Sequence, residues 1–209
     1  MRAEAVSKTR VIRLGFGGEE SSARTLVTMS DFTVPGLDPV AADKLSTILQ
    51  HRLAGLIDLH LTLKHVHWNV VGPNFIAVHE MLDPQVDLVR GFSDDIAERI
   101  AALGASPVGT LGAQERERSW DDYSLGRDTA QRHLAALNKV YGGVIADHRS
   151  AIAETGDFDP VTEDMLTGQS AELEKFQWFV RAHLEGADGQ LAGADKTSEI
   201  GAAQEVEDA

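Results

Sequence analysis

The sequence predicts an all-α protein, a bundle of four long helices with a short helix in the crossover between the second and the third. Three observations carry this prediction. Leucine and isoleucine recur at helical spacing over long segments, as they do between Leu45 and Leu63. Glycine and proline stand where these segments end. Residues that favour helix N-termini stand where the following segments begin.

Start and stop signals justify each element in order. Gly72-Pro73 ends the first helix, and Asn74 is a suitable N-cap for the second. Gly104 ends the second helix, and Asp159-Pro160 starts the last one. The long helices are expected at about residues 38–70, 74–103, 122–154 and 160–185, with the short helix inside 106–120.

We expect one domain between two tails. Residues 38–186 form the bundle, and residues 1–37 are rich in glycine and serine, which predicts a flexible N-terminal arm. Met29 is an alternative translation start. Residues 187–209 hold six acidic residues against Lys196, which predicts an acidic flexible C-terminal tail.

Composition narrows the chemistry. The chain of 209 residues has no cysteine, so carboxylates and imidazoles must hold any metal ion. We see no apolar run of membrane-spanning or signal-peptide length and expect a cytoplasmic protein without a membrane partner. The net charge of −14 attracts cations and repels nucleic acid at long range.

Five candidate metal ligands lie between residues 67 and 98, and their spacing indicates that two chains share each site. They are His67, His79, Asp83, Asp94 and Glu98. Asp94 and Glu98 lie 15 and 19 residues beyond His79. At about 1.5 Å per residue this is roughly 22 to 28 Å along a helix, too far for one ion. Either the residues are unrelated, or a second copy of the chain completes each site.

Helical angles favour the second option. At about 100° per residue, the four candidate ligands on the second helix lie along one stripe of its surface; they are His79, Asp83, Asp94 and Glu98. A separate set, expected to face the subunit's own core, comprises Leu82, Val86, Val89, Ile96 and Ile100. Two such helices, antiparallel about a two-fold axis near Leu88 and Val89, place His79 and Asp83 opposite Asp94 and Glu98 of the partner. His67 folds back beside His79 across a short turn.

The motifs around these ligands resemble the Dps family of miniferritins, most closely its actinobacterial type. The resemblance rests on His67-Trp68-Asn69-Val70, on the segment 72–83 with its His-Glu-Met-Leu-Asp, and on Leu173–Val180. It covers about residues 31–186. It implies a ferritin-like four-helix bundle, a hollow dodecamer and ligands at His67, His79, Asp83, Asp94 and Glu98. The chain has no Glu-x-x-His, which ordinary ferritin-type sites within one subunit use.

The resemblance further implies a ferroxidase, an oxidoreductase acting on metal ions. Two Fe(II) ions per inter-subunit site would be oxidised, preferably by hydrogen peroxide, and stored as an Fe(III) mineral that protects the cell and its DNA from oxidative damage. Trp68 is a candidate for the surroundings of the ions, with interface packing as the alternative. Asp164 is a candidate for a pore that admits iron, with stabilisation of a helix N-terminus as the alternative.

Two other functions stay open. A nucleoid-compacting protein would bind DNA first and iron second, and basic residues of the N-terminal arm, Arg2, Lys8, Arg10, Arg13 and Arg24, could contribute through avidity. We expect DNA binding to be weak and salt-sensitive at most. A helical scaffold with structural zinc and no redox role is the third function, and an anaerobic ferrous titration followed by peroxide would distinguish it.

Overall fold

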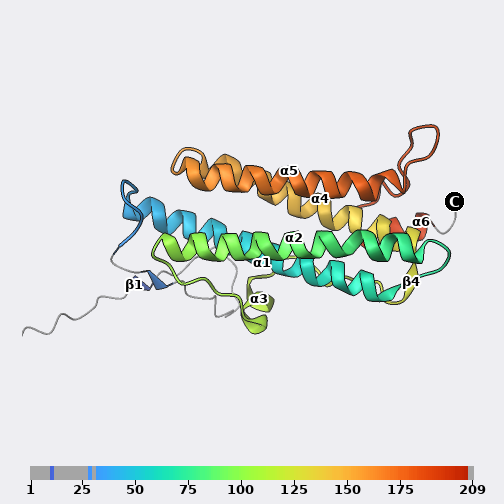
Figure 1. The fold of residues 1–209 in the computed structure, drawn as a ribbon, viewed down its shortest axis with the longest axis horizontal. Coiled ribbons are helices and arrows are strands. Elements are labelled where there is room, and N and C mark those ends of the chain that lie inside the picture. The colour runs from blue at the N-terminus through green and yellow to red at the C-terminus, as the bar shows by residue number, and fades with distance from the viewer. Residues whose placement is uncertain (1–9, 12–27, 30–31, 207–209) are drawn as a thin grey trace, which may run out of the picture.

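Four long helices pack side by side in the computed structural model, which describes residues 10–11, 28–29 and 32–206 (Figure 1). The first two form one hairpin, α1 (Pro39–Asn69) with α2 (Phe75–Ala102). The second hairpin joins α4 (Ala130–Thr155) to α5 (Pro160–Ala182), and α1 packs on α4. The predicted all-α four-helix bundle is confirmed.

Matching signals start two of the long helices. Asp38-Pro39-Val40 opens α1, and Asp159-Pro160-Val161 opens α5. In each case the aspartate side chain accepts hydrogen bonds from backbone amides of the first turn, and proline occupies a position where its missing N–H costs nothing. Asn74 differs from the prediction: it stands at the N-cap of α2, but its side chain makes no capping hydrogen bond.

The core face of α2 is the one that helical spacing predicts. Leu82, Val86, Val89, Ile96 and Ile100 are all buried and belong to the main apolar core. The helix continues through Pro84 and ends at Ala102, followed by Gly104 with a φ of 89°. Gly72, in the turn before α2, has a φ of 96°, in the region that glycine reaches without steric cost.

The crossover between α2 and α4 contains the predicted short helix, α3 (Leu111–Glu117). The Gln50 side chain of α1 anchors the crossover just before α3. Its Nε2 donates to the Val108 carbonyl at 2.9 Å, and its Oε1 accepts from the Val108 backbone N–H at 2.9 Å. The prediction that the third long helix begins near residue 122 is wrong. Residues before Ala130 instead run as a loop and then pair β4 (Asp128–Thr129) in parallel with β3 (Val70–Val71).

The C-terminal segment also differs from the prediction of a flexible tail. Residues Glu199–Glu205 form α6, whose Ala202 and Ala203 are fully buried against the bundle, with α6 packing on α4 (Figure 1). The Ser198 side chain caps this helix by accepting from the Gly201 amide at 3.1 Å.

The predicted N-terminal arm lies mostly outside the described residues. Within it, β1 (Arg10–Val11) pairs antiparallel with β2 (Thr28–Met29). Of the helices in the described part of the chain, none is long and apolar enough to cross a membrane.

Candidate metal centre

The turn between α1 and α2 brings two predicted ligands into contact. His67 lies in the last turn of α1 and His79 near the start of α2. Their imidazole rings stack with centroids 3.6 Å apart and planes 22° apart. His67 is 7% exposed, so the pair is held in the packed end of the helical hairpin. The expectation that His67 folds back beside His79 is confirmed.

Reciprocal hydrogen bonds fix the orientation of both rings. Nδ1 of His67 lies 3.0 Å from the His79 carbonyl oxygen, and Nδ1 of His79 lies 2.9 Å from the His67 carbonyl oxygen. A carbonyl only accepts, so each Nδ1 must carry the proton. The lone pair of each neutral ring is then on Nε2, the arrangement in which a backbone carbonyl orients a metal-binding histidine.

Asp83 joins this pair and is itself paired with a lysine. Its Oδ1 lies 3.2 Å from Nδ1 of His67 and accepts from Lys64 Nζ at 2.7 Å. The hydrogen bond from Lys64 holds the pKa of Asp83 below its usual value, and the nearby imidazoles act in the same direction. Asp83 is therefore a carboxylate at neutral pH, with an ammonium group at one oxygen.

Lys64 is a residue that the sequence reasoning missed. It precedes His67 by three residues, so the two share one face of α1 and reach the same neighbourhood. This spacing was a usable signal. His65 points elsewhere, as expected, and its Nε2 lies 2.8 Å from the Leu125 carbonyl oxygen.

The other two predicted ligands lie on the far half of α2. Asp94 and Glu98 are exposed, while Ile96 and Ile100 between and beyond them are buried. Asp94 lines an open cleft of about 320 Å³ together with His60 and Arg90. Within 10–11, 28–29 and 32–206, no three His, Cys, Asp or Glu side chains are gathered in a way that could hold a metal ion. One chain thus keeps the five residues in two groups.

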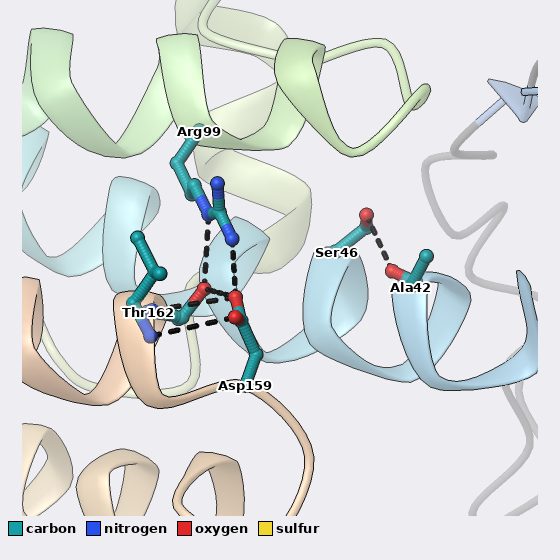
Figure 2. A network of polar contacts seen from close by, with 6 residues as sticks. Ala42, Ser46, Arg99, Asp159 and Thr162 are labelled. Atoms are coloured by element: carbon teal, nitrogen blue, oxygen red, sulfur yellow. Dashed lines mark hydrogen bonds and ion pairs between the residues drawn. The ribbon is translucent and has the colours of Figure 1, made fainter. Parts of the chain in front are cut away.

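A polar network fixes the backbone next to Glu98. Arg99 donates from Nε to Thr162 Oγ1 at 3.0 Å and pairs through Nη2 with Asp159 Oδ2, the N-cap residue of α5 (Figure 2). Thr162 Oγ1 in turn donates to Asp159 Oδ2 at 2.5 Å. The network ties the last turns of α2 to the first turn of α5, so the helix end that carries Glu98 is anchored.

Trp68 and Asp164 are placed at the surface of the single chain. Trp68 is 69% exposed although it adjoins the buried His67, and Asp164 is exposed in the first turns of α5. A large exposed indole beside a buried imidazole is a surface that a second chain could cover.

Known proteins resemble this chain in sequence and in fold. Residues 46–188 match the model of the ferritin-like domain. The chain is 59% identical over 178 residues to the DNA protection during starvation protein of Mycolicibacterium smegmatis, covering 85% of this chain and 97% of that protein. The structure resembles DpsA14 from Streptomyces coelicolor, with a TM-score of 0.77, 62% identity and coverage of 78% of this chain and 96% of that one. It also resembles Dps from Microbacterium arborescens in the high iron form, with a TM-score of 0.66, 29% identity and coverage of 70% and 96%.

Proposed function

We propose that this chain, which belongs to the Dps family of ferritin-like proteins, is a ferroxidase that oxidises Fe(II) at sites shared between two subunits and stores the Fe(III) product in a hollow oligomer. The single observation that supports this proposal best is the stacked His67–His79 pair. Both rings have Nδ1 directed to backbone carbonyls, which leaves two Nε2 lone pairs for a metal ion. A structure of the Microbacterium arborescens relative is described as a high iron form, which fits iron as the substrate.

The proposed ligands bind two different ions, the histidines one and the carboxylates the other. His67 and His79, imidazoles of borderline hardness, suit the tighter Fe(II) ion. Asp83 of the same chain and Glu98 of the partner would bind the second ion, with Asp94 shared between them or orienting them. Bringing the two exposed carboxylates of one chain's α2 opposite the two histidines of another chain requires an antiparallel contact of the α2 helices about a two-fold axis, which yields two identical sites per dimer.

The redox step moves two electrons. Each of two ferrous ions gives one electron to hydrogen peroxide, the O–O bond breaks, and with two protons the peroxide becomes two water molecules. The carboxylates stabilise the additional positive charge on the ferric products. Removing free iron and peroxide together prevents hydroxyl radicals from forming, and this is the proposed protective role.

Storage requires a closed shell. We infer a dodecamer assembled from two-fold dimers, with Asp164 at a pore that admits ferrous ions. Asp164 is exposed near the α5 N-terminus. A carboxylate there can attract ferrous ions and can also interact favourably with the helix dipole. The net charge of −14 per chain raises the local cation concentration around such a shell.

Mixed oligomers of two inactive variants test whether sites are shared. His67→Ala removes one half of every site, and Asp94→Ala removes part of the other half. In shells co-refolded from equal amounts, an intact site needs one chain of each kind in the right order, so about a quarter of the sites are wild type. Anaerobic Fe(II) loading followed by peroxide should then give about a quarter of wild-type Fe(III) formation.

His65→Ala provides the matched control, because His65 lies two residues from His67 and binds the Leu125 carbonyl instead. It should keep wild-type oxidation in pure and mixed shells. If the two inactive variants, each folded and assembled, recover no activity on mixing, then each site belongs to one chain and the shared-site proposal fails.

The second candidate function is DNA binding through the N-terminal arm. It is supported by the name of the Mycolicibacterium smegmatis relative and by the basic residues within positions 1–28. The C-terminal segment is acidic and partly folded into α6, so it offers no free basic tail among the described residues. Gel shifts at physiological salt, with and without residues 1–28, test this candidate, and tight binding without the arm would refute it.

A further inference from the structure

A cleft of about 520 Å³ lies between α1, α4 and the segment that leads into α6. This volume falls in the range of small-molecule sites, roughly 300–1,000 Å³. The α1 residues that line it are Arg52, Gly55, Asp58 and Thr62. At about 100° per residue, the last three lie roughly 120° to 180° around the helix from His67, and Arg52 lies about 22 Å from it along the axis, so the cleft is separate from the candidate metal centre.

The charges that line the cleft do not balance. Five lining residues are acidic and two, Arg52 and Lys139, are basic. Arg52 Nη2 lies 3.3 Å from Asp147 Oδ2, so this pair is internally neutral. Lys139 Nζ donates to the Ala194 carbonyl at 3.0 Å, which places its ammonium on the backbone of the C-terminal segment. Beside the lining, the Arg118 guanidinium pairs with Asp58 at 3.5 Å and with Asp122, so the negative charge that remains in the cleft lies at Asp121 and Glu199.

Glu199 carries this excess. It is the first residue of α6, and its Oε2 atom is buried without a hydrogen-bond partner among the described residues. Burial raises the pKa of Glu199, and the nearby carboxylates of Asp58 and Asp121 raise it further. A hydrogen bond from the Ser124 amide and the charge of Arg118 act in the opposite direction without cancelling the rise. An unpaired buried carboxylate oxygen is unfavourable, and a cationic donor in the cleft would relieve it.

The walls indicate what kind of cation fits. Val140, Val144 and Ile200 contribute apolar surface, and Gly143 leaves open space, since a Cβ built there meets nothing within 4 Å. Trp120 forms an aromatic wall held by its Nε1, which donates to Asp58 Oδ2 at 2.8 Å. An ammonium group with an attached alkyl chain matches both the carboxylates and these surfaces.

Other ligand classes match less well. In the described part of the chain, no group of three carboxylates or imidazoles could hold a metal ion, so a compact divalent cation lacks its ligands here. An anion would meet the carboxylate excess. A neutral alcohol would fill the apolar part but would leave Glu199 without a charged partner.

We propose that this cleft binds an alkylammonium ion, with the ammonium group at Glu199 and the alkyl chain along Val140, Val144 and Ile200 beneath Trp120. The site depends on the folded C-terminal segment, because Glu199 and Ile200 both come from α6. It is independent of iron oxidation, since none of its residues belongs to the proposed metal ligands. The ammonium can come from a free amine or from a lysine side chain of another protein.

Calorimetry on the full-length, iron-free oligomer tests the proposal with three probes of equal length: hexylamine, hexanol and hexanoate. Hexylamine should bind, and the other two should bind at least about tenfold more weakly, because a charged hydrogen bond contributes about one decade or more. Capped lysine, N-acetyl-lysine methylamide, separates the two sources: tighter binding than hexylamine points to a protein side chain, weaker binding to a free amine.

Two variants on different helices locate the site. Glu199→Gln should weaken hexylamine binding by at least about tenfold, and Gly143→Leu should block it by filling the open space. Glu205→Gln is the control, because Glu205 lies on the same helix but does not line the cleft. No binding of hexylamine up to about 10 mM, equal binding of hexanol, or full affinity in both folded variants would each overturn the proposal.

Discussion

Two helices of this protein begin with the same tripeptide, Asp-Pro-Val, and the aspartate that caps the second of them is also paired with an arginine. Asp38 caps α1 by accepting from the Val40 amide at 2.9 Å and the Ala41 amide at 3.2 Å. Asp159 caps α5 and also pairs with Arg99 of α2 (Figure 2). Replacing each aspartate with alanine therefore separates the cap from the ion pair.

The structure sets the size of each effect. Loss of an N-cap side chain costs about 1 kcal/mol of unfolding free energy, which is the whole expectation for the exposed Asp38. Asp159 is 7% exposed, and Arg99 would lose a charge-assisted partner in a largely buried setting. That loss adds about 2 kcal/mol, so Asp159→Ala should destabilise the protein by about 3 kcal/mol.

Urea denaturation followed by far-ultraviolet circular dichroism measures both variants, at one protein concentration because the stability of the proposed oligomer would depend on concentration. Burial alone raises the pKa of Asp159, but hydrogen bonds from Thr162 and Arg99 outweigh it and leave the pKa below its usual value. A lowered pKa means that this stabilisation is present above the pKa of an aspartate in the unfolded chain and is lost as the pH falls through the folded-state pKa. Equal destabilisation by the two substitutions at neutral pH would refute the ion-pair argument.

Three further substitutions have defined outcomes. Lys64→Met removes the ammonium at Asp83 and should tighten Fe(II) binding by about threefold or more in anaerobic calorimetry; weaker binding would show that the lysine supports the metal. Tyr141→Phe should cost about 1–3 kcal/mol in urea denaturation, because the buried hydroxyl donates to Gln85 Oε1 at 2.6 Å, and adding Gln85→Leu should recover part of it. Gly193→Ala should free α6 for proteolysis while leaving bundle melting unchanged, because Gly193 has a φ of 73° and a Cβ there would lie 3.1 Å from Ala202 Cβ; unchanged protection of α6 would contradict this.

The parts of the fold that the sequence predicts are those set by local signals. Apolar spacing and the Asp-Pro and Gly signals place α1, α2 and α5 within a few residues of their observed bounds. The start of α4 was predicted eight residues too early, since what stops the helix there is a pairing of Val70 with Asp128, distant in the sequence. Such pairings leave no periodic trace in the chain.

The C-terminal helix shows the same limit. Its acidic composition indicates a solvated tail, yet Ala202 and Ala203 give α6 a small apolar face that fits against α4. Two alanines carry almost no hydrophobic signal in the sequence, and their burial depends on the shape of the surface that receives them. For this reason the sequence does not predict that Glu199 lines a cleft beside α4.

At the candidate metal centre, helical periodicity predicts which residues face the core and which face solvent, but it does not predict the individual side-chain contacts. The angles along α2 correctly separate the buried Leu82 and Ile96 from the exposed Asp94, and a short turn brings His67 to His79. The Lys64 contact with Asp83 was missed because a lysine near metal ligands is not itself a ligand type. The spacing places Lys64 on the same face of α1 as His67, but whether its ammonium reaches Asp83 depends on rotamers, which spacing does not specify.

The division of ligands along one continuous helix makes the proposed chemistry depend on assembly. Because α2 runs unbroken from Phe75 to Ala102, the distance between its two groups of ligands is set by the helix itself, at roughly 22 Å between His79 and Asp94. An unassembled chain then offers iron only two imidazoles and one lysine-paired carboxylate, which hold an ion more weakly than the complete set. Under this proposal, ferrous ions and peroxide would meet at bound sites only once a partner supplies the remaining carboxylates, and the two-fold contact that completes each site would also be the unit from which the shell is built. Oxidation would then be confined to particles able to retain the ferric product.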